Sequence, residues 1–257
     1  MTTADIALSP ASADRHDAVA VVLAAHGSTR RPDANAVVAG HAEMMRRSGP
    51  FRHVSTAFLM GSGEGAETAL PGTDTSTVLI VPYMMSDGFL AEALSGQISK
   101  SLHKHGAQPR IIVTLPVGTH AGITQIVRHA GERALIRAGF DAGSSTLLLV
   151  AHGSKGRPES RNGARAHVDK LRSQGGFAAV ELAMLEEPPL LDDMLAAIEG
   201  PVVVVGLFAA PGGHAVDDVQ DAISRAANPQ IVDAGPVGVD PRMAEIAVMR
   251  ALGALDP

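Results

Sequence analysis

The sequence contains no cysteine among its 257 residues. This absence excludes disulfides, thiolate metal sites, a cysteine nucleophile and a cysteine-ligated iron–sulfur cluster in this chain. Any metal ion must therefore be held by histidine, carboxylate or other oxygen groups. The sequence also lacks a basic stripe, and its net charge is −6. We therefore expect no nucleic-acid partner.

Long apolar runs are missing as well. No stretch approaches the ~20 apolar residues that a membrane-spanning helix needs, so we expect no membrane partner. Residues 1–17 are rich in Ala, Ser, Thr and Asp and contain no apolar run of signal-peptide length. We interpret them as a flexible N-terminal tail of a cytoplasmic protein. No P-loop or other nucleotide motif is present. Hydrophobic residues make up 46% of the chain, which is typical of a globular protein with a core.

A run of aliphatic residues that ends at His-Gly-Ser occurs twice. Residues 21–28 read VVLAAHGS, and residues 147–154 read LLLVAHGS. The two histidines, His26 and His152, are 126 positions apart (152 minus 26), close to half of the chain length. The repeat indicates a duplicated chain with two domains of about 125 residues each.

Short apolar runs alternate with longer amphipathic ones on both sides of a polar linker, residues 139–145. We expect strands over 19–25, 54–59, 78–83 and 110–115, and then over 146–151, 179–185, 202–208 and 230–233. We expect helices over 32–47, 89–105 and 121–138, and then over 158–173, 190–199, 215–227 and 241–252. This alternation indicates parallel sheets covered by helices on both faces.

Further landmarks recur in the same order in the two halves. AFLM at 57–60 corresponds to AMLE at 183–186, PYMMSDGF at 82–89 to LFAAPGGH at 207–214, and LPVG at 115–118 to GPVG at 235–238. We therefore predict an α/β fold of two tandem flavodoxin-like domains with a cleft between them. Their predicted extents are residues 18–140 and 144–257.

Polar side chains follow three successive strands of the second half: His152, Glu186 and His214. Ligands of an open parallel sheet bind outside the carboxyl ends of the strands. Two imidazoles and a carboxylate on one rim suit a divalent first-row metal ion, and the same groups can move protons. The sequence therefore predicts a metal and catalytic site made of these three residues.

The corresponding positions of the first half are His26, Met60 and Phe89. One polar group is kept, and two are replaced by apolar side chains. The simplest interpretation is that one site stayed active and its duplicate lapsed, which would make His26 vestigial.

Together these motifs resemble the sirohydrochlorin chelatases, the class II tetrapyrrole chelatases that insert Fe²⁺ or Co²⁺ into sirohydrochlorin. The resemblance rests on AHGS at 151–154, Leu185-Glu186, and PGGHAVDD at 211–218, and it covers nearly the whole chain from about residue 18. It implies two tandem chelatase-like domains and a role in sirohaem or cobalamin biosynthesis. It also implies that His152 and His214 hold the metal and face the macrocycle, with Glu186 near the metal. In two-domain members of the family this histidine pair stands in the first half, whereas here it stands in the second, as in protoporphyrin-type ferrochelatases.

The resemblance further implies a tetrapyrrole substrate that carries several carboxylates. Basic side chains and helix-start N–H groups can bind those carboxylates, and glycines before the second histidine leave room for a flat ring. The candidate substrate-binding residues are Ser154, Lys155, Arg157, Arg161, Arg30, Gly212 and Gly213. The divalent metal is a substrate, no organic cofactor is implied, and we expect a monomer or a homodimer.

Other interpretations of these residues remain open. His152 can be a structural histidine, Glu186 can be a solvated loop acid because Glu187 and Pro188 follow it, and the basic residues can belong to a solvated helix face. The remaining histidines, His41 and His167 among them, receive no role. At the level of function, the alternative is a non-catalytic metal or tetrapyrrole carrier. A periplasmic-binding-like sensor is disfavoured because no signal-peptide-like run is present.

Overall fold

The computed structural model describes residues 18–29, 31–51, 53–60, 75–87, 92–93, 96–98, 100, 109–154, 158–212, 214–226 and 228–255. The first half contains β1 (Val19–Ala25), α2 (Pro32–Ser48), β2 (His53–Phe58), β3 (Thr77–Pro82), β4 (Arg110–Val113), the 3-10 helix η2 (Val117–Thr119) and α4 (Gly122–Ala138). The second half contains the 3-10 helix η3 (Ala142–Ser144), β5 (Thr146–Ala151), α5 (Glu159–Gln174), β6 (Ala179–Met184), α6 (Leu191–Ala197), β7 (Val202–Gly206), the π-helix η4 (His214–Asp218), α7 (Val219–Ala226), β8 (Ile231–Pro236), the 3-10 helix η5 (Val237–Val239) and α8 (Arg242–Gly253). No helix within the described ranges is both long enough and apolar enough to cross a membrane.

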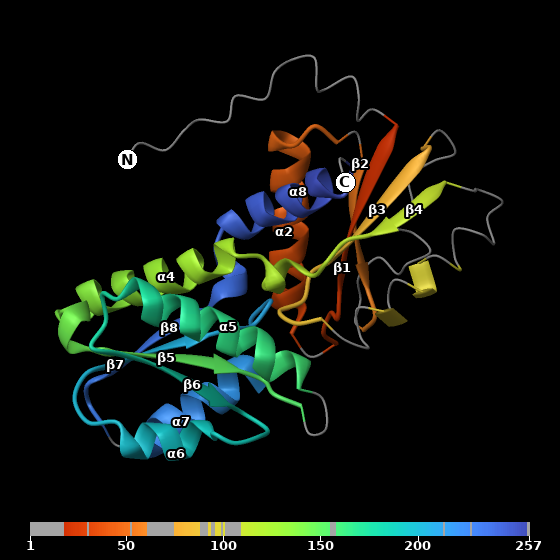
Figure 1. The fold of residues 1–257 in the computed structure, drawn as a ribbon. Coiled ribbons are helices and arrows are strands. Elements are labelled where there is room, and N and C mark those ends of the chain that lie inside the picture. Colours follow the sequence, from red (N-terminus) through yellow and green to blue (C-terminus); the bar gives the residue numbers. More distant parts are fainter. Residues whose placement is uncertain are drawn as a thin grey trace.

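Each half contributes one four-stranded parallel sheet. The strand order is β2-β1-β3-β4 in the first sheet and β6-β5-β7-β8 in the second (Figure 1). All seven residues of β1 are buried, as the uninterrupted aliphatic run predicts. The eight expected strands are confirmed, and the largest difference is at β8, which continues three residues beyond the expected end at 233. The expected helix over 89–105 falls mostly outside the described residues.

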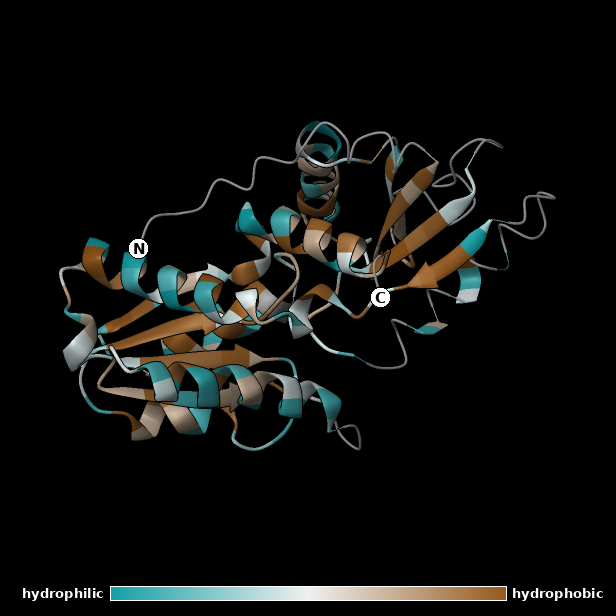
Figure 2. Ribbon diagram, turned by 45° about the horizontal axis from the view of Figure 1, so that its top comes forward, coloured by the Kyte–Doolittle hydropathy of each residue, from teal (hydrophilic) through white to brown (hydrophobic). Residues whose placement is uncertain are grey.

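Helices cover the faces of both sheets, and their apolar sides point inward (Figure 2). In the second half, α4 and α5 cover one face and α6 and α7 cover the other. In the first half, α2 and α8 cover one face. The opposite face packs against Ile98, which is fully buried. The chain therefore has two parallel sheets packed against helices, as the alternation predicts.

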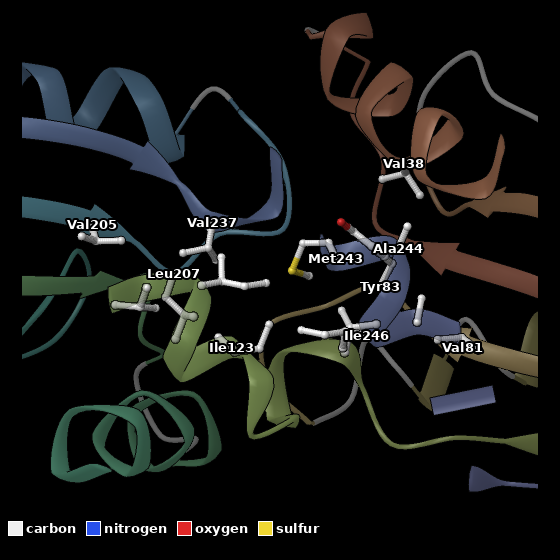
Figure 3. Packing of buried hydrophobic residues seen from close by; sticks show 14 of the residues in the cluster. Val38, Val81, Tyr83, Ile123, Val205, Leu207, Val237, Met243, Ala244 and Ile246 are labelled. Carbon is white, nitrogen blue, oxygen red and sulfur yellow. The ribbon is translucent and has the colours of Figure 1, made fainter. Parts of the chain in front are cut away.

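The helix that ends each half packs on the sheet of the other half. Helix α4 contacts β7, β8 and α5, whereas α8 contacts α2, β3 and η2 (Figure 1). This exchange joins one face of each sheet in a shared hydrophobic cluster, in which Ile123 of α4 and Met243 and Ile246 of α8 are buried (Figure 3). Burial of each such side chain contributes about 2 kcal/mol, so the exchanged helices hold the halves together. The two sheets lie on either side of residues 140–144 in the sequence, but α4 and α8 each pack on the sheet that the other half forms.

The LPVG and GPVG repeats mark the points where the chain crosses between the halves. Gly118 lies in η2 and Gly238 in η5, and their N–H groups donate to the carbonyls of Met84 and Phe208, both over 2.9 Å. A Cβ atom on Gly118 would lie 2.1 Å from the Cα of Met85, and one on Gly238 would lie 1.9 Å from the carbonyl oxygen of Ala209. Backbone approaches this close admit only glycine, which accounts for its presence in both repeats.

Two buried histidines bind these crossings from the opposite half. Nε2 of His41 in α2 donates to the Gly238 carbonyl over 2.9 Å, and Nε2 of His167 in α5 donates to the Gly118 carbonyl over 2.9 Å. The two histidines are 126 positions apart (167 minus 41), so they are duplicates of one another. Their side chains, which received no role from the sequence, are structural joints between the halves.

The two joints differ in one hydrogen bond. Nδ1 of His167 accepts from the Thr124 hydroxyl over 2.9 Å, whereas buried Nδ1 of His41 has no hydrogen-bond partner. The residue of α8 that corresponds to Thr124 is Ala244, which cannot donate. Burial lowers the pKa of both histidines, although the bonds to the glycine carbonyls oppose this and, for His41, so does the charge of Asp240. Both rings are therefore held as neutral donors at Nε2.

Candidate functional site

The His-Gly-Ser corner has the same geometry in both halves. Gly27 and Gly153 follow β1 and β5 with φ of 73° and 81°, a conformation that favours glycine. Nδ1 of His26 lies 2.9 Å from the Gly27 carbonyl, and Nδ1 of His152 lies 3.1 Å from the Gly153 carbonyl. Each ring thus carries its proton on Nδ1, which puts the lone pair on Nε2. This is the tautomer that a histidine needs to bind a metal through Nε2.

The next strand brings the second candidate residue to this corner. The N–H of Glu186 donates to the His152 carbonyl over 3.1 Å, and in the first half the N–H of Met60 donates to the His26 carbonyl over 2.9 Å. The backbone therefore confirms that Glu186 and Met60 occupy duplicate positions. The Glu186 carboxylate lies 3.7 Å from Nδ1 of His152, and the two side chains are 53% and 47% exposed. A carboxylate here can orient the imidazole and compensate the charge of a bound cation.

The third candidate residue, His214, opens the π-helix η4, which continues into α7. Its side chain lies outside the part of the structure that is described. Single π turns occur frequently at functional sites. The N–H of Gly212 donates to the Ala210 carbonyl over 2.8 Å, and a Cβ atom on Gly212 would meet nothing within 4 Å. The backbone at Gly212 is therefore open, as a site for a flat ring needs.

Two of the candidate substrate-binding residues contact an acid of the chain itself. The N–H of Ser154 donates to Oε1 of Glu187 over 3.2 Å, and Nη1 of Arg161 lies 3.2 Å from Oε2. The Glu187 side chain is only 11% exposed. A substrate carboxylate would have to compete with this side chain. Glu187 had no role in the sequence interpretation; its position beside Glu186 was the only signal. The candidates Arg30, Lys155, Arg157 and Gly213 lie outside the described residues.

One ion pair joins the rims of the two sheets. Nη2 of Arg31, six residues after β1, lies 2.5 Å from Oδ1 of Asp217 in η4. The carboxyl end of β1 therefore lies beside the helix that His214 opens. Asp217 also stands in the first turn of η4, where a carboxylate complements the helix dipole.

The described side chains supply two of the three predicted metal ligands. They contain no group of three His, Asp or Glu side chains that could hold a metal ion. A set of His152, Glu186 and a ligand from η4 would require the exposed Glu186 carboxylate, which lies at Nδ1 of His152, to turn toward Nε2. Such a set suits Fe²⁺, Co²⁺ and similar divalent ions, and it holds them less tightly than thiolates do.

Comparisons with known proteins agree on one family. The CbiX family model matches residues 20–134 and 146–254, one match in each half. A protein of Halobacterium salinarum named probable sirohydrochlorin cobaltochelatase is 24% identical, and the alignment covers 93% of this chain and 92% of that protein.

Solved structures share the fold. CbiX, the terminal enzyme for biosynthesis of sirohaem in denitrifying bacteria, has a TM-score of 0.75 at 23% identity over 92% of this chain and all of its own. SirB from Bacillus subtilis with Fe³⁺ has a TM-score of 0.78 at 16% identity over 93% of this chain and 96% of its own. Both structures extend over the two halves of this chain.

Proposed function

Because this chain belongs to the CbiX family, we propose that it is a sirohydrochlorin chelatase, which inserts Fe²⁺ or Co²⁺ into sirohydrochlorin. The products would be sirohaem or a cobalt-containing precursor of cobalamin. The observation that carries the proposal is the pairing of His152 with Glu186 at the carboxyl end of the second sheet. The named activity of the Halobacterium salinarum relative supports it.

In the proposed reaction, the ring loses two pyrrole protons and gains one divalent metal ion. His152 and His214 hold the ion through neutral imidazole, which releases a metal more readily than a thiolate cage does. The N–H bonds of the pyrroles break, bonds from the metal to the ring nitrogens form, and the protons pass to the imidazoles as the metal leaves them. Glu186 compensates the charge of the ion and relays protons to water.

Substrate recognition in this proposal uses the open backbone at Gly212 and the basic residues of the rims. A Cβ atom at Gly212 meets nothing within 4 Å, so a planar ring can lie against this turn. Arg161 is 39% exposed, but it already pairs with Glu187, so the ring carboxylates are left to the other basic residues. Lys155, Arg157 and Arg30 are proposed to bind these carboxylates.

A spectrophotometric assay tests the proposal. Purified protein, sirohydrochlorin and Co²⁺ or Fe²⁺ are mixed without oxygen, and loss of the free-base spectrum is followed. We expect acceleration over the reaction without protein. If the protein binds Co²⁺ or the ring but gives no acceleration, it is a carrier and not an enzyme.

A further inference from the structure

We propose that Glu187, together with Arg161, is a positioning residue that fixes His152 relative to Glu186. The proposal deepens the proposed function and rests on it only for the catalytic measurement below. Glu187 contacts the His-Gly-Ser corner through the N–H of Ser154 and contacts α5 through Arg161. It is also the neighbour of Glu186 in the chain. One carboxylate therefore links the two loops that carry the predicted ligands.

The first half shows why a hydrogen-bond acceptor is needed at this point. There, the N–H of Ser28 donates to the side-chain oxygen of Asn35 over 3.0 Å, and Asn35 is 9% exposed. Asn35 and Arg161 are duplicates, 126 positions apart (161 minus 35), at the same place in α2 and α5. A guanidinium cannot accept a hydrogen bond. Once arginine stands at this position, the N–H of Ser154 needs another acceptor, and Glu187 supplies it.

Two bonds then tie the corner to the second loop. The His152 carbonyl accepts from the N–H of Glu186, and the N–H of Ser154 donates to Glu187. They lie on either side of Gly153, where a Cβ atom would come within 3.0 Å of Cγ of Glu187. This corner also places Nδ1 of His152 against the Gly153 carbonyl. Loss of the Glu187 contact therefore frees the segment that sets the tautomer and direction of the imidazole.

The same contacts argue against a substrate carboxylate at Ser154. A carboxylate already accepts from Ser154 and pairs with Arg161, and its side chain is 11% exposed. We therefore assign Ser154 and Arg161 to the support of His152, and this assignment is open to test because the alternative predicts the opposite change in KM.

The first measurement needs no turnover and has a matched control. Ring ¹⁵N shifts of His26 and His152 are recorded by NMR at pH 8 and assigned with His26→Gln and His152→Gln. In Glu187→Ala we expect the His152 ring to lose its single Nδ1–H tautomer while His26 is unchanged. In Asn35→Ala we expect the reverse. Glu187→Gln, which keeps an acceptor for Ser154, should retain most of the wild-type His152 signal. An unchanged His152 signal in Glu187→Ala overturns the proposal even if the variant is folded.

The second measurement uses Co²⁺ alone and then the full reaction. We expect Glu187→Ala to weaken Co²⁺ binding and lower kcat by about 10- to 100-fold, with Asn35→Ala within about 2-fold of wild type. Glu187→Gln should recover much of the loss. A lower KM with unchanged kcat in Glu187→Ala would instead assign Ser154 and Arg161 to a substrate carboxylate. If the wild type binds Co²⁺ without turnover, the proposed function fails, while the NMR and Co²⁺ results still decide the role of Glu187.

Discussion

The carboxyl ends of the two sheets differ in chemistry but share their backbone. In the first half, the loops after β1 and β2 carry His26 and Met60, and Met60 is 51% exposed. In the second half, the same loops carry His152 and Glu186. The backbone hydrogen bonds from Met60 to His26 and from Glu186 to His152 correspond in the two halves. The His-Gly-Ser corner is therefore a structural element of the fold, and its partners decide whether it can become a site.

The joints between the halves also share their backbone contacts and differ in their side-chain partners. His41 and His167 make duplicate bonds to the crossings, but only His167 has a hydroxyl, that of Thr124, for its second nitrogen. The ring of Tyr83 stacks on that of His41 with 5.6 Å between the ring centroids, and its hydroxyl donates to the same Gly238 carbonyl over 3.0 Å. One joint is thus satisfied at both ring nitrogens, and the other is reinforced by an aromatic ring.

The largest expected effect separates the two corners. His152→Ala should lower the chelatase rate at least about 100-fold, because it removes a proposed metal ligand and proton acceptor. His26→Ala, in the corner where Met60 stands at the position of Glu186, should change the rate by less than about 3-fold. The rates are measured by loss of the free-base spectrum at equal protein concentration. If His26→Ala were the damaging change, the active half would be the first one.

A smaller effect tests the two joints. Thr124→Val leaves Nδ1 of His167 buried without a donor, so the free energy of unfolding should fall by about 2 kcal/mol. Ala244→Ser introduces a hydroxyl at the position that corresponds to Thr124, where it can donate to Nδ1 of His41, and should raise the free energy of unfolding by about 1 kcal/mol. Both values come from denaturant unfolding at pH 8. A loss of stability in Ala244→Ser would show that the 4% exposed alanine site has no room for a hydroxyl.

The smallest effect is the pH dependence of stability. Because the pKa values of His41 and His167 in the folded state are below 6.5, the unfolded chain binds more protons as pH falls through 6.5. The free energy of unfolding should be level above this pH and fall below it, by less than about 1 kcal/mol per histidine over the first pH unit.

The two histidines should not contribute equally to this pH dependence. Protonated His167 can donate to the Thr124 hydroxyl, whereas the new N–H of His41 has no hydrogen-bond acceptor and is helped only by the charge of Asp240. The free energy of unfolding is measured by denaturant over a pH series. Its slope against pH should fall more in His41→Gln than in His167→Gln. Equal slopes would mean that the Thr124 bond does not distinguish the joints.

The local sequence pattern predicts the strands well because β1, β5 and β7 are buried aliphatic runs with sharp ends. It also predicts the rim positions, since side chains that follow parallel strands gather at one edge. The exchange of α4 and α8 could not be predicted, because an amphipathic helix does not specify which sheet it covers. The duplicate spacing of His41 and His167 was a usable signal for the joints. Glu187 could not be assigned, since its role depends on a distant residue, Arg161.

The exchanged helices also determine when the first half can finish folding during synthesis of the chain. The last strand of the first sheet ends at Val113, but α8, which covers part of that sheet, begins only at Arg242. Domains near the N-terminus usually fold first during translation, but this one must keep an apolar face open until α8 has been synthesised. A chain that stops before residue 242 therefore loses the cover of its first sheet, so the damage from a late stop codon falls on the half that the ribosome made first.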